Sequence, residues 1–319
     1  MQIPKKLNLA NLPTPIQKFN FNGCNFLMKR DDYTGTELTG NKIRKLEYLM
    51  YEAKRLKSDY VFTCGGDQSN HCRATAIAAA QLGIKSRLFL WGKENKNKDG
   101  NLFLDEMFGA ETEYFNKQDY KNVLQIMAER EEQFTKKKKR VYTFPSGGSS
   151  ALGIWGYINF IPELLTQINK RSINSILSAA GSGGTAAGML IGSAINNWNV
   201  KIFAVDVFNN KTEMEEMIIN VAEECLKKYK INKRINYKNL EVMDGYSTEG
   251  YKSIEPKKLK LIKKLAKENG VLLDPAYTGK AFYAFNENFL AGKKNTKTMF
   301  LHTGGLYGVF SKRKEYLGI

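Results

Sequence analysis

The sequence predicts an α/β protein whose parallel sheets carry helices on both faces. Short runs rich in β-branched and aromatic residues alternate with helical patterns along almost all of the 319-residue chain. Residues 43–56 illustrate the helical pattern, because their apolar side chains recur three and four positions apart and so line one face. Repetition of strand, helix and strand favours parallel sheets. The length is close to that of two ordinary domains.

Eight segments have the composition and length of strands. In chain order they are Cys24 to Lys29, Tyr60 to Cys64, Ser86 to Trp91, Val141 to Phe144, Ser175 to Ala180, Lys201 to Val207, Val271 to Leu273 and Thr298 to His302. Three of them run into glycine-rich turns, at residues 65–66, 181–184 and 304–305, that open helices. Ligands of α/β sheets bind beyond the carboxyl ends of strands, and a helix N-terminus offers free N–H groups to an anion. We therefore expect an anionic ligand with more than one polar group.

Composition excludes several classes of protein. The apolar share is 42%, no apolar run approaches the roughly 18 residues that span a bilayer, and residues 1–5 do not resemble a signal peptide. We expect a cytoplasmic protein that does not bind membranes. The chain has two histidines, His71 and His302, and four cysteines without a C-x-x-C pair. These counts argue against a metal site, a disulfide frame and a histidine-based hydrolase.

The chain is strongly basic. It has 49 lysines and arginines against 32 acidic residues, which gives a net charge of +17. Such a charge is compatible with a nucleic-acid-binding protein, and this function stays open as the non-catalytic alternative. The lysines are scattered along the chain, however, and the single dense run, residues 136–140, has the simpler interpretation of a solvated helix end. We therefore expect no specific nucleic-acid partner.

Residues 181–188 form a glycine-rich turn of an unusual type. The segment is not a Walker loop, since no Gly-Lys pair follows, and it misses the dinucleotide fingerprint because residue 186 is alanine. Small residues let the backbone approach a phosphate closely, and the hydroxyls of Ser182 and Thr185 supply further donors. A tight strand-to-helix turn without a ligand is the alternative.

Lys42 lies near the start of a predicted helix, after Gly40 and Asn41. The helix dipole disfavours a cation there by up to about 1 kcal/mol. One reason for a lysine at this place is a Schiff base with an aldehyde cofactor, which removes the ammonium charge. The alternative is an ordinary exposed lysine. Lys45, about one helical turn further on, is expected to have no role in the chemistry.

Seven motifs occur in a fixed order. They are Lys29-Arg30-Asp31-Asp32, Gly40-Asn41-Lys42, Gln68-Ser69-Asn70-His71, Gly147-Gly148-Ser149-Ser150-Ala151-Leu152-Gly153, Gly181-Ser182-Gly183-Gly184-Thr185, Asp274-Pro275-Ala276-Tyr277-Thr278-Gly279-Lys280 and His302-Thr303-Gly304-Gly305. Together they resemble the pyridoxal-phosphate-dependent family that contains D-cysteine desulfhydrase and 1-aminocyclopropane-1-carboxylate (ACC) deaminase. The resemblance extends from residue 12 to the C-terminus.

The resemblance implies the tryptophan-synthase-β-like fold (fold type II), with pyridoxal 5'-phosphate in a cleft between two parallel-sheet α/β domains. Residues 1–49 and 161–319 would form the large cofactor-binding domain, and residues 50–160 the small one. It also implies a homodimer that acts on a small amino acid.

The resemblance assigns expected roles to individual residues. Lys42 would form the Schiff base, Asn70 would support the phenolic oxygen, Tyr277 would lie against the ring and Thr303 would face the pyridine nitrogen. The phosphate would be held by Ser182, Gly183, Gly184 and Thr185. Each residue also has a simpler interpretation, for example Asn70 as a good residue for a helix start. One anionic aromatic aldehyde accounts for all of them together.

The residues expected to act in catalysis and those expected to bind the substrate overlap. The catalytic candidates are Lys42, Ser69, Tyr251 and Tyr277, and the substrate-binding candidates are Gln68, Ser69 and Asn70. Ser69 is similar to the serine that meets the substrate carboxylate in this family. Tyr251 falls where the family keeps a second active-site tyrosine, although its sequence context matches only in part.

Two threonines favour D-cysteine as the substrate. At the positions of Thr278 and Thr303, ACC deaminases of the family typically carry Glu and Leu, whereas desulfhydrases carry threonines. A carboxylate beside the pyridine nitrogen would keep it protonated and strengthen the electron sink, which a neutral hydroxyl cannot do. We expect α,β-elimination of D-cysteine to hydrogen sulfide, pyruvate and ammonia. The alternatives are ACC deamination and elimination from another β-substituted alanine, such as L-cysteate or β-chloroalanine.

Overall fold

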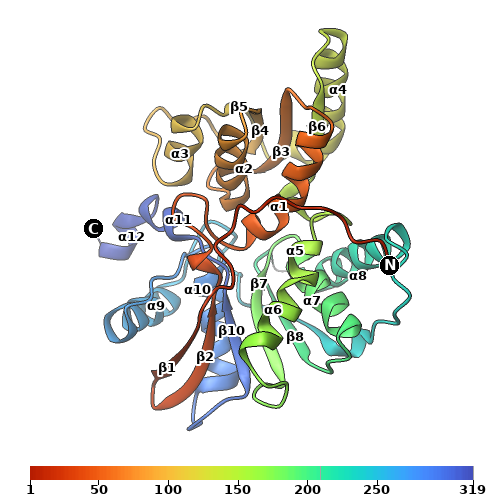
Figure 1. Cartoon of the computed structure of the whole chain (residues 1–319). Helices are drawn as coiled ribbons and strands as arrows, with labels where there is room; N and C mark the ends of the chain where they lie inside the picture. Colours follow the sequence, from red (N-terminus) through yellow and green to blue (C-terminus); the bar gives the residue numbers. More distant parts are fainter. Residues whose placement is uncertain (209, 319) are drawn as a thin grey trace.

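Two separate β-sheets organise the chain in the computed structural model, which describes residues 1–208 and 210–318 (Figure 1). The larger sheet has six strands in the order β1-β2-β10-β7-β8-β9. Their bounds are β1 Ile16–Phe21, β2 Cys24–Arg30, β10 Thr298–His302, β7 Ser175–Ala180, β8 Lys201–Asp206 and β9 Leu240–Met243. The β1–β2 pair is antiparallel and the other four pairs are parallel.

The smaller sheet has four parallel strands in the order β5-β4-β3-β6. Their bounds are β5 Glu111–Phe115, β4 Lys85–Trp91, β3 Tyr60–Gly66 and β6 Val141–Thr143. The two-domain parallel α/β fold predicted from the sequence is thus confirmed. The predicted domain boundaries after residues 49 and 160 fall inside α1 and α6, and the division at these residues stays a prediction.

Helices cover both sheets, and α1 lies between the two sheets in the view of Figure 1. The helices are α1 Asn41–Arg55, α2 Asn70–Gln81, α3 Asn101–Met107, α4 Val123–Lys136, α5 Trp155–Ile158, α6 Phe160–Gln167, α7 Gly184–Ile195, α8 Lys211–Lys228, α9 Pro256–Asn269, α10 Thr278–Phe285, α11 Leu306–Phe310 and α12 Arg313–Leu317. Within residues 1–208 and 210–318, no helix combines the length and apolarity needed to span a membrane.

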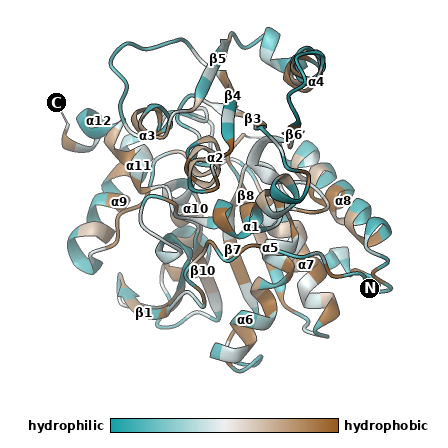
Figure 2. Cartoon of the chain, turned by 45° about the horizontal axis from the view of Figure 1, so that its top comes forward, coloured by the Kyte–Doolittle hydropathy of each residue, from teal (hydrophilic) through white to brown (hydrophobic). Residues whose placement is uncertain are grey.

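Side-chain alternation along the strands builds a separate core on each face of the larger sheet. Ile202 packs with α5 to α8 on one face, whereas Phe203 packs with α9 and α10 on the other. In Figure 2, which is coloured by hydropathy, β7 and α6 carry hydrophobic segments, whereas α4 and α9 carry hydrophilic turns. Burial on both faces explains why these strands read as continuous apolar runs in the sequence.

Seven of the eight predicted strands are present, and Val271 to Leu273 is the error. This segment is extended and buried, but it belongs to no sheet. The reason is topological, because β10 already has β2 and β7 as its two neighbours. The side chains of Val271 and Leu273 pack instead in the core beneath α9 and α10. Strands β1, β5 and β9 were not predicted.

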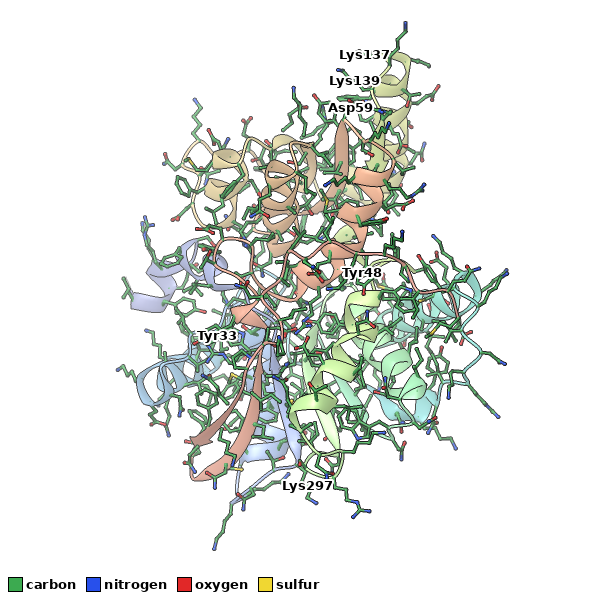
Figure 3. All side chains as sticks on the ribbon, viewed as in Figure 1. Tyr33, Tyr48, Asp59, Lys137, Lys139 and Lys297 are labelled. Carbon is green, nitrogen blue, oxygen red and sulfur yellow. The ribbon has the colours of Figure 1, made fainter. Side chains whose placement is uncertain are left out.

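The basic run at residues 136–140 forms the end of α4 and the turn that follows. All five side chains are exposed, as the sequence predicted for a solvated helix end. Figure 3 shows Lys137 and Lys139 at the tip of this projecting helix, with Asp59 nearby. Arg140 pairs with Asp59 at 3.3 Å, so the run is tied to the start of β3.

A buried ion network fixes α1 to the larger sheet. Arg44 donates to both oxygens of Asp31 at 2.8 Å and to both oxygens of Glu163 at 2.7 and 3.0 Å. Lys29 binds the same glutamate at 2.7 Å, and the Tyr157 hydroxyl donates to Asp31 at 2.6 Å. Each charge in the network therefore meets an opposite charge.

We expect the Arg44→Met variant to lose about 3–5 kcal/mol of unfolding free energy, because it leaves Asp31 and Glu163 buried without their shared partner. Urea unfolding of the wild type and the variant measures the loss. Arg55→Met is the matched control on the same helix, since Arg55 forms an exposed pair with Glu52. Equal midpoints for the two variants would contradict this role of the network.

Candidate functional site

A pocket lies where the N-termini of α1, α2 and α7 meet. Most of the residues that the sequence predicted for the cofactor line it, although they come from distant parts of the chain. The lining consists of Asn41, Lys42, Asn70, Ala179, Ala180, Gly181, Ser182, Gly183, Gly184, Thr185, Ala186, Tyr277 and Thr303. The fold therefore brings Lys42, the glycine turn, Tyr277 and Thr303 to one place.

Lys42 is the second residue of α1, as expected. Its Nζ donates to Asn41 Oδ1 at 3.0 Å, and no carboxylate of the described residues lies within ion-pair distance of it. Burial lowers the pKa of Lys42 to about 8, although the charge of Asp274 acts in the opposite direction. A substantial fraction of this amine is therefore neutral near physiological pH.

Two glycines allow the start of α1 to approach the turn after β10. Gly40 has φ of 93°, and a Cβ atom there would lie 2.8 Å from Thr303 O. Gly304 has φ of 91°, and a Cβ atom there would lie 2.8 Å from the Gly40 Cα. The close approach lets Asn41 N donate to Thr303 O at 3.0 Å, which places Thr303 beside Lys42.

The glycine turn after β7 opens α7 without a side-chain cap. Gly183, the residue before the helix, has φ of 70°, in the left-handed region that favours glycine. A Cβ atom on Gly184 would lie 2.4 Å from Ser149 Oγ and 2.8 Å from Lys45 Nζ. Gly184 N donates to Ser182 O at 2.8 Å and Ala187 N to Gly183 O at 3.0 Å, so within the described residues the N–H groups of Thr185 and Ala186 are the ones available to an outside acceptor.

Lys45 has an environment that the sequence analysis did not predict. It is only 1% exposed, and its Nζ donates to Gly147 O at 3.1 Å and to Ser149 Oγ at 2.9 Å. Among the residues that the structure describes, no carboxylate pairs with it. Burial lowers the pKa of Lys45 well below its usual value, and Lys42 lowers it further. Its spacing of three from Lys42, which puts both on one helix face, was the available signal.

Tyr251 and Tyr277 meet in the structure. Their hydroxyls are in hydrogen-bond contact, and their rings pack edge to face with centroids 5.3 Å apart. Burial raises the pKa of both phenols. The partial sequence match of Tyr251 thus corresponds to a residue at the pocket, and both hydroxyls are protonated at neutral pH.

Two buried lysines hold the loop that carries Tyr251. Lys280, from α10, donates to Gly250 O at 2.6 Å and to Tyr251 O at 3.3 Å. Lys258, from α9, donates to Tyr246 O at 2.6 Å and to Glu249 Oε2 at 2.7 Å. This irregular loop therefore has a defined position over the pocket.

The three substrate-binding candidates at the start of α2, Gln68, Ser69 and Asn70, lie in different environments. Ser69 Oγ accepts from the backbone N–H groups of residues 71 and 72, both at 3.2 Å, and so caps the helix. Asn70 Oδ1 accepts from Asn101 Nδ2 at 3.0 Å. The Gln68 amide turns away from the pocket, because it donates to Asp99 O and accepts from Asn101 N, both at 2.9 Å.

Thr278 does not line the pocket, contrary to the expectation that both threonines lie near the cofactor ring. Its hydroxyl donates to Asp274 Oδ1 at 2.6 Å and accepts from the backbone N of Asp274 at 3.0 Å. The Asp274 carboxylate also accepts from three backbone N–H groups at the start of α10. Thr278 is therefore occupied in a helix-start turn, and Thr303 alone of the two faces the pocket.

Comparisons with known proteins agree with this geometry. The family model described as pyridoxal-phosphate dependent enzyme matches residues 7–304. A Thermotoga maritima protein named putative 1-aminocyclopropane-1-carboxylate deaminase is 37% identical, covering 97% of this chain and 99% of its own. The Arabidopsis thaliana protein named bifunctional D-cysteine desulfhydrase/1-aminocyclopropane-1-carboxylate deaminase is 36% identical, covering 96% and 79%. The crystal structure of an ACC deaminase homologue superposes with a TM-score of 0.89 at 34% identity, covering 99% and 96%.

The electrostatics of the pocket suit an anion such as phosphate. The N-terminus of the 12-residue helix α7 supplies N–H groups and a positive dipole end. Lys45, whose ammonium group lacks a carboxylate partner within the described part of the chain, lies directly behind the turn. An anion bound there would favour the charged form of Lys45, which burial otherwise disfavours.

We expect the Lys45→Met variant to bind inorganic phosphate roughly tenfold to a hundredfold more weakly than the wild type, since a charged hydrogen bond contributes about 1.5–3 kcal/mol. The measurement is the phosphate dependence of the thermal midpoint of cofactor-free protein. Lys54→Met, on the exposed side of α1, is the control and should retain the affinity. Equal phosphate affinity in wild type and Lys45→Met would disprove the role of Lys45.

Proposed function

Because the chain belongs to the pyridoxal-phosphate dependent enzymes, we propose that it is a lyase that eliminates hydrogen sulfide from D-cysteine and leaves pyruvate and ammonia. The observation that supports this choice most strongly is the lining of the pocket. Among the described residues that form it, none is Asp or Glu, and Thr303 presents a neutral hydroxyl. The family depends on pyridoxal phosphate, and in this pocket the cofactor would have a neutral hydroxyl and no carboxylate beside it.

The residues present fit the cofactor. The turn at residues 182–185 and Lys45 would hold the phosphate, because they combine free N–H groups, hydroxyls and an unpaired ammonium group. Lys42 would hold the aldehyde carbon. Asn101 occupies Oδ1 of Asn70, which leaves the Asn70 amide nitrogen to donate to the phenolic oxygen. Tyr277 would cover the ring.

When bound, the cofactor supplies an electron sink that stabilises negative charge at the substrate α-carbon. Lys42 is the proposed acceptor of the α-proton once the substrate amine has displaced it. Its lowered pKa, about 8, suits a base that works near neutral pH.

The paired tyrosines are the proposed proton donors. Their raised pKa values keep both phenols protonated, so they act as acids rather than as nucleophiles at neutral pH. A proton passed from Tyr277 to the departing sulfur can be replaced from Tyr251 across their hydrogen bond.

Ser69 is proposed to bind the substrate carboxylate. Its oxygen already accepts two backbone N–H bonds, so its own O–H proton is free to donate to an anion. The N-terminus of α2, which Ser69 caps, adds favourable dipole charge. The carboxylate would thereby be fixed over the pocket with the α-hydrogen directed toward Lys42.

Elimination of a thiolate requires less electron withdrawal by the cofactor than opening of a cyclopropane ring does. Thiolate is a good leaving group, whereas cleavage of a cyclopropane bond requires stronger withdrawal toward a protonated pyridine nitrogen. Asp274 is the nearest candidate for that task, but its oxygens are occupied by α10 and Thr278. Burial raises the pKa of Asp274 in spite of those hydrogen bonds.

ACC deamination is the second candidate, because relatives at 36–37% identity bear that name. The same Lys42, Tyr251, Tyr277 and Ser69 would serve it. The two functions therefore differ in what surrounds the ring nitrogen, at Thr303, and product analysis separates them.

We expect cofactor uptake by cofactor-free protein to accelerate with rising pH, with a midpoint near 8. The reason is that only the neutral Lys42 amine attacks an aldehyde, and the ammonium form dominates below this pH. An unperturbed lysine would give a midpoint near about 10.4. Absorbance of the bound cofactor follows the reaction. Lys42→Ala should abolish turnover and covalent retention after borohydride reduction, whereas recovery of the cofactor on another lysine would refute the assignment.

We expect the wild type to form pyruvate and sulfide from D-cysteine at least about tenfold faster than 2-oxobutyrate from ACC. The variant Thr303→Glu should shift the ratio toward 2-oxobutyrate, because Thr303 lines the pocket and a glutamate there introduces a carboxylate beside the ring. Thr303→Leu, which adds no charge, is the control. A wild type that opens the cyclopropane as readily as it releases sulfide would refute the choice of D-cysteine.

A further inference from the structure

The glycine- and serine-rich segment after β6 reaches the turn that lines the pocket. Ser149 Oγ lies 2.9 Å from Lys45 Nζ and 2.8 Å from Ser182 Oγ. Glycines permit this close packing, because a Cβ atom on Gly147 would clash with Ser182 Oγ. A Cβ atom on Gly184 would clash with Ser149 Oγ in the same way. Ser149 is therefore placed to transmit a hydrogen bond from Lys45 to the proposed anion site.

The hydrogen bonds of this first chain point in one direction. An ammonium group has three N–H donors and no acceptor. Because Lys45 donates to Gly147 O at 3.1 Å and to Ser149 Oγ, the hydroxyl hydrogen of Ser149 is left for Ser182 Oγ. Burial lowers the pKa of Lys45, but an anion in the pocket acts in the opposite direction and favours the ammonium form. With an anion bound, Ser182 thus accepts from Ser149, and its own hydrogen is free to point at the anion.

A second chain reaches the same turn from the start of α1. Asn41 Oδ1 accepts from Lys42 Nζ at 3.0 Å, and Asn41 Nδ2 donates to Thr185 Oγ1 at 3.1 Å. The ammonium form of Lys42, which predominates below its pKa of about 8, can face only the oxygen of the amide. The amide nitrogen is thereby directed at Thr185. The hydroxyl hydrogen of Thr185 is then also free for a ligand.

The described lining of the pocket offers few acceptors in return. None of its side chains is Asp or Glu. The amide oxygen of Asn70 is occupied by Asn101 Nδ2, and the carbonyl oxygens of Ser182 and Gly183 accept from backbone N–H groups at the start of α7. Within this lining, a proton carried by the ligand therefore meets donors rather than acceptors at the turn.

We propose that Ser149 and Asn41 are positioning residues that make the hydroxyls of Ser182 and Thr185 donors only, so that the turn selects a tetrahedral dianion without a proton. A phosphate monoester dianion and sulfate meet this description near neutral pH. Inorganic phosphate retains at least one proton there, and it should bind more weakly than sulfate. This inference rests on the proposed phosphate site and is independent of the amino acid that the enzyme converts.

The test measures the affinities of cofactor-free protein for inorganic sulfate and inorganic phosphate by calorimetry near neutral pH. We expect sulfate to bind at least about fivefold more tightly than phosphate, because the phosphate proton leaves a donor of the site without an acceptor. Ser149→Ala frees the Ser182 hydroxyl to accept that proton, so the preference for sulfate should fall at least about threefold. Asn41→Ala, which interrupts the second chain, should lower the preference as well.

Ser150→Ala is the matched control. It removes the neighbouring hydroxyl, which accepts from Gly153 N at 3.2 Å and does not contact the turn. This variant should keep the wild-type preference for sulfate. A structural disturbance of the segment alone would change both serine variants alike, and this outcome would overturn the specific role of Ser149.

A second measurement uses the loaded enzyme and does not depend on turnover. The phosphorus NMR shift of the bound cofactor should keep its dianion value down to about pH 5, although a free phosphate monoester takes up a proton near about pH 6. In Ser149→Ala, the midpoint of this protonation should move toward the free value. Protonation of the wild-type complex near pH 6 would overturn the selection of a dianion.

The remaining outcomes separate this inference from the proposed function. Phosphate affinity equal to or above that for sulfate in the wild type would overturn the inference. A preference for sulfate that Ser149→Ala and Asn41→Ala leave unchanged would overturn the role of both chains. Absence of binding of either anion would refute the phosphate site itself. The elimination is tested separately by pyruvate formation from D-cysteine, which none of these results presupposes.

Discussion

The site depends on a helix that carries buried positive charge on two sides. On one side of α1, Arg44 is neutralised by Asp31 and Glu163. On the other side, Lys42 lines the pocket and Lys45 lies behind the turn at Gly184, and neither has a carboxylate partner among the described residues. The first arrangement fixes the helix to the larger sheet. The second leaves two buried amines whose charged forms an anionic ligand would stabilise. The same helix thus joins the ion network of the larger sheet to the proposed anion site.

Much of this arrangement could be predicted from the sequence because it is local. Strand endings followed by glycine turns, and the motif around Lys42, identify the pocket from short segments. The hairpin β1–β2 was also predictable, since Asn22-Gly23 connects Phe21 and Cys24 in a two-residue turn with positive φ at both positions. The antiparallel pair at the edge of the sheet was nevertheless missed.

The remaining features depend on contacts between distant segments. The spacing of Lys42 and Lys45 places both on one helix face, but the burial of Lys45 behind the turn at Gly184 depends on a distant segment. Gln68 and Asn70 are only two positions apart in the sequence, yet Asn101 and Asp99 turn the first away and Asn101 orients the second. Likewise Thr278 belongs to a motif that resembles a family signature, but its hydroxyl is occupied by Asp274. Sequence similarity locates such residues without determining which way they face.

Tyr251 joins the proposed proton donors to the aromatic side chains beside them. Its hydroxyl contacts Tyr277, while its ring lies beside the rings of Phe208 and Trp91. The loop that carries it is held through backbone carbonyls by Lys258 and Lys280, and not through the tyrosine side chain. The position of the loop is consequently independent of the residue at 251, whereas proton delivery depends on it. Phe208 and Trp91 pack against the Tyr251 ring, so a change at either residue alters the surface beside the tyrosine pair without removing the contact between the two hydroxyls.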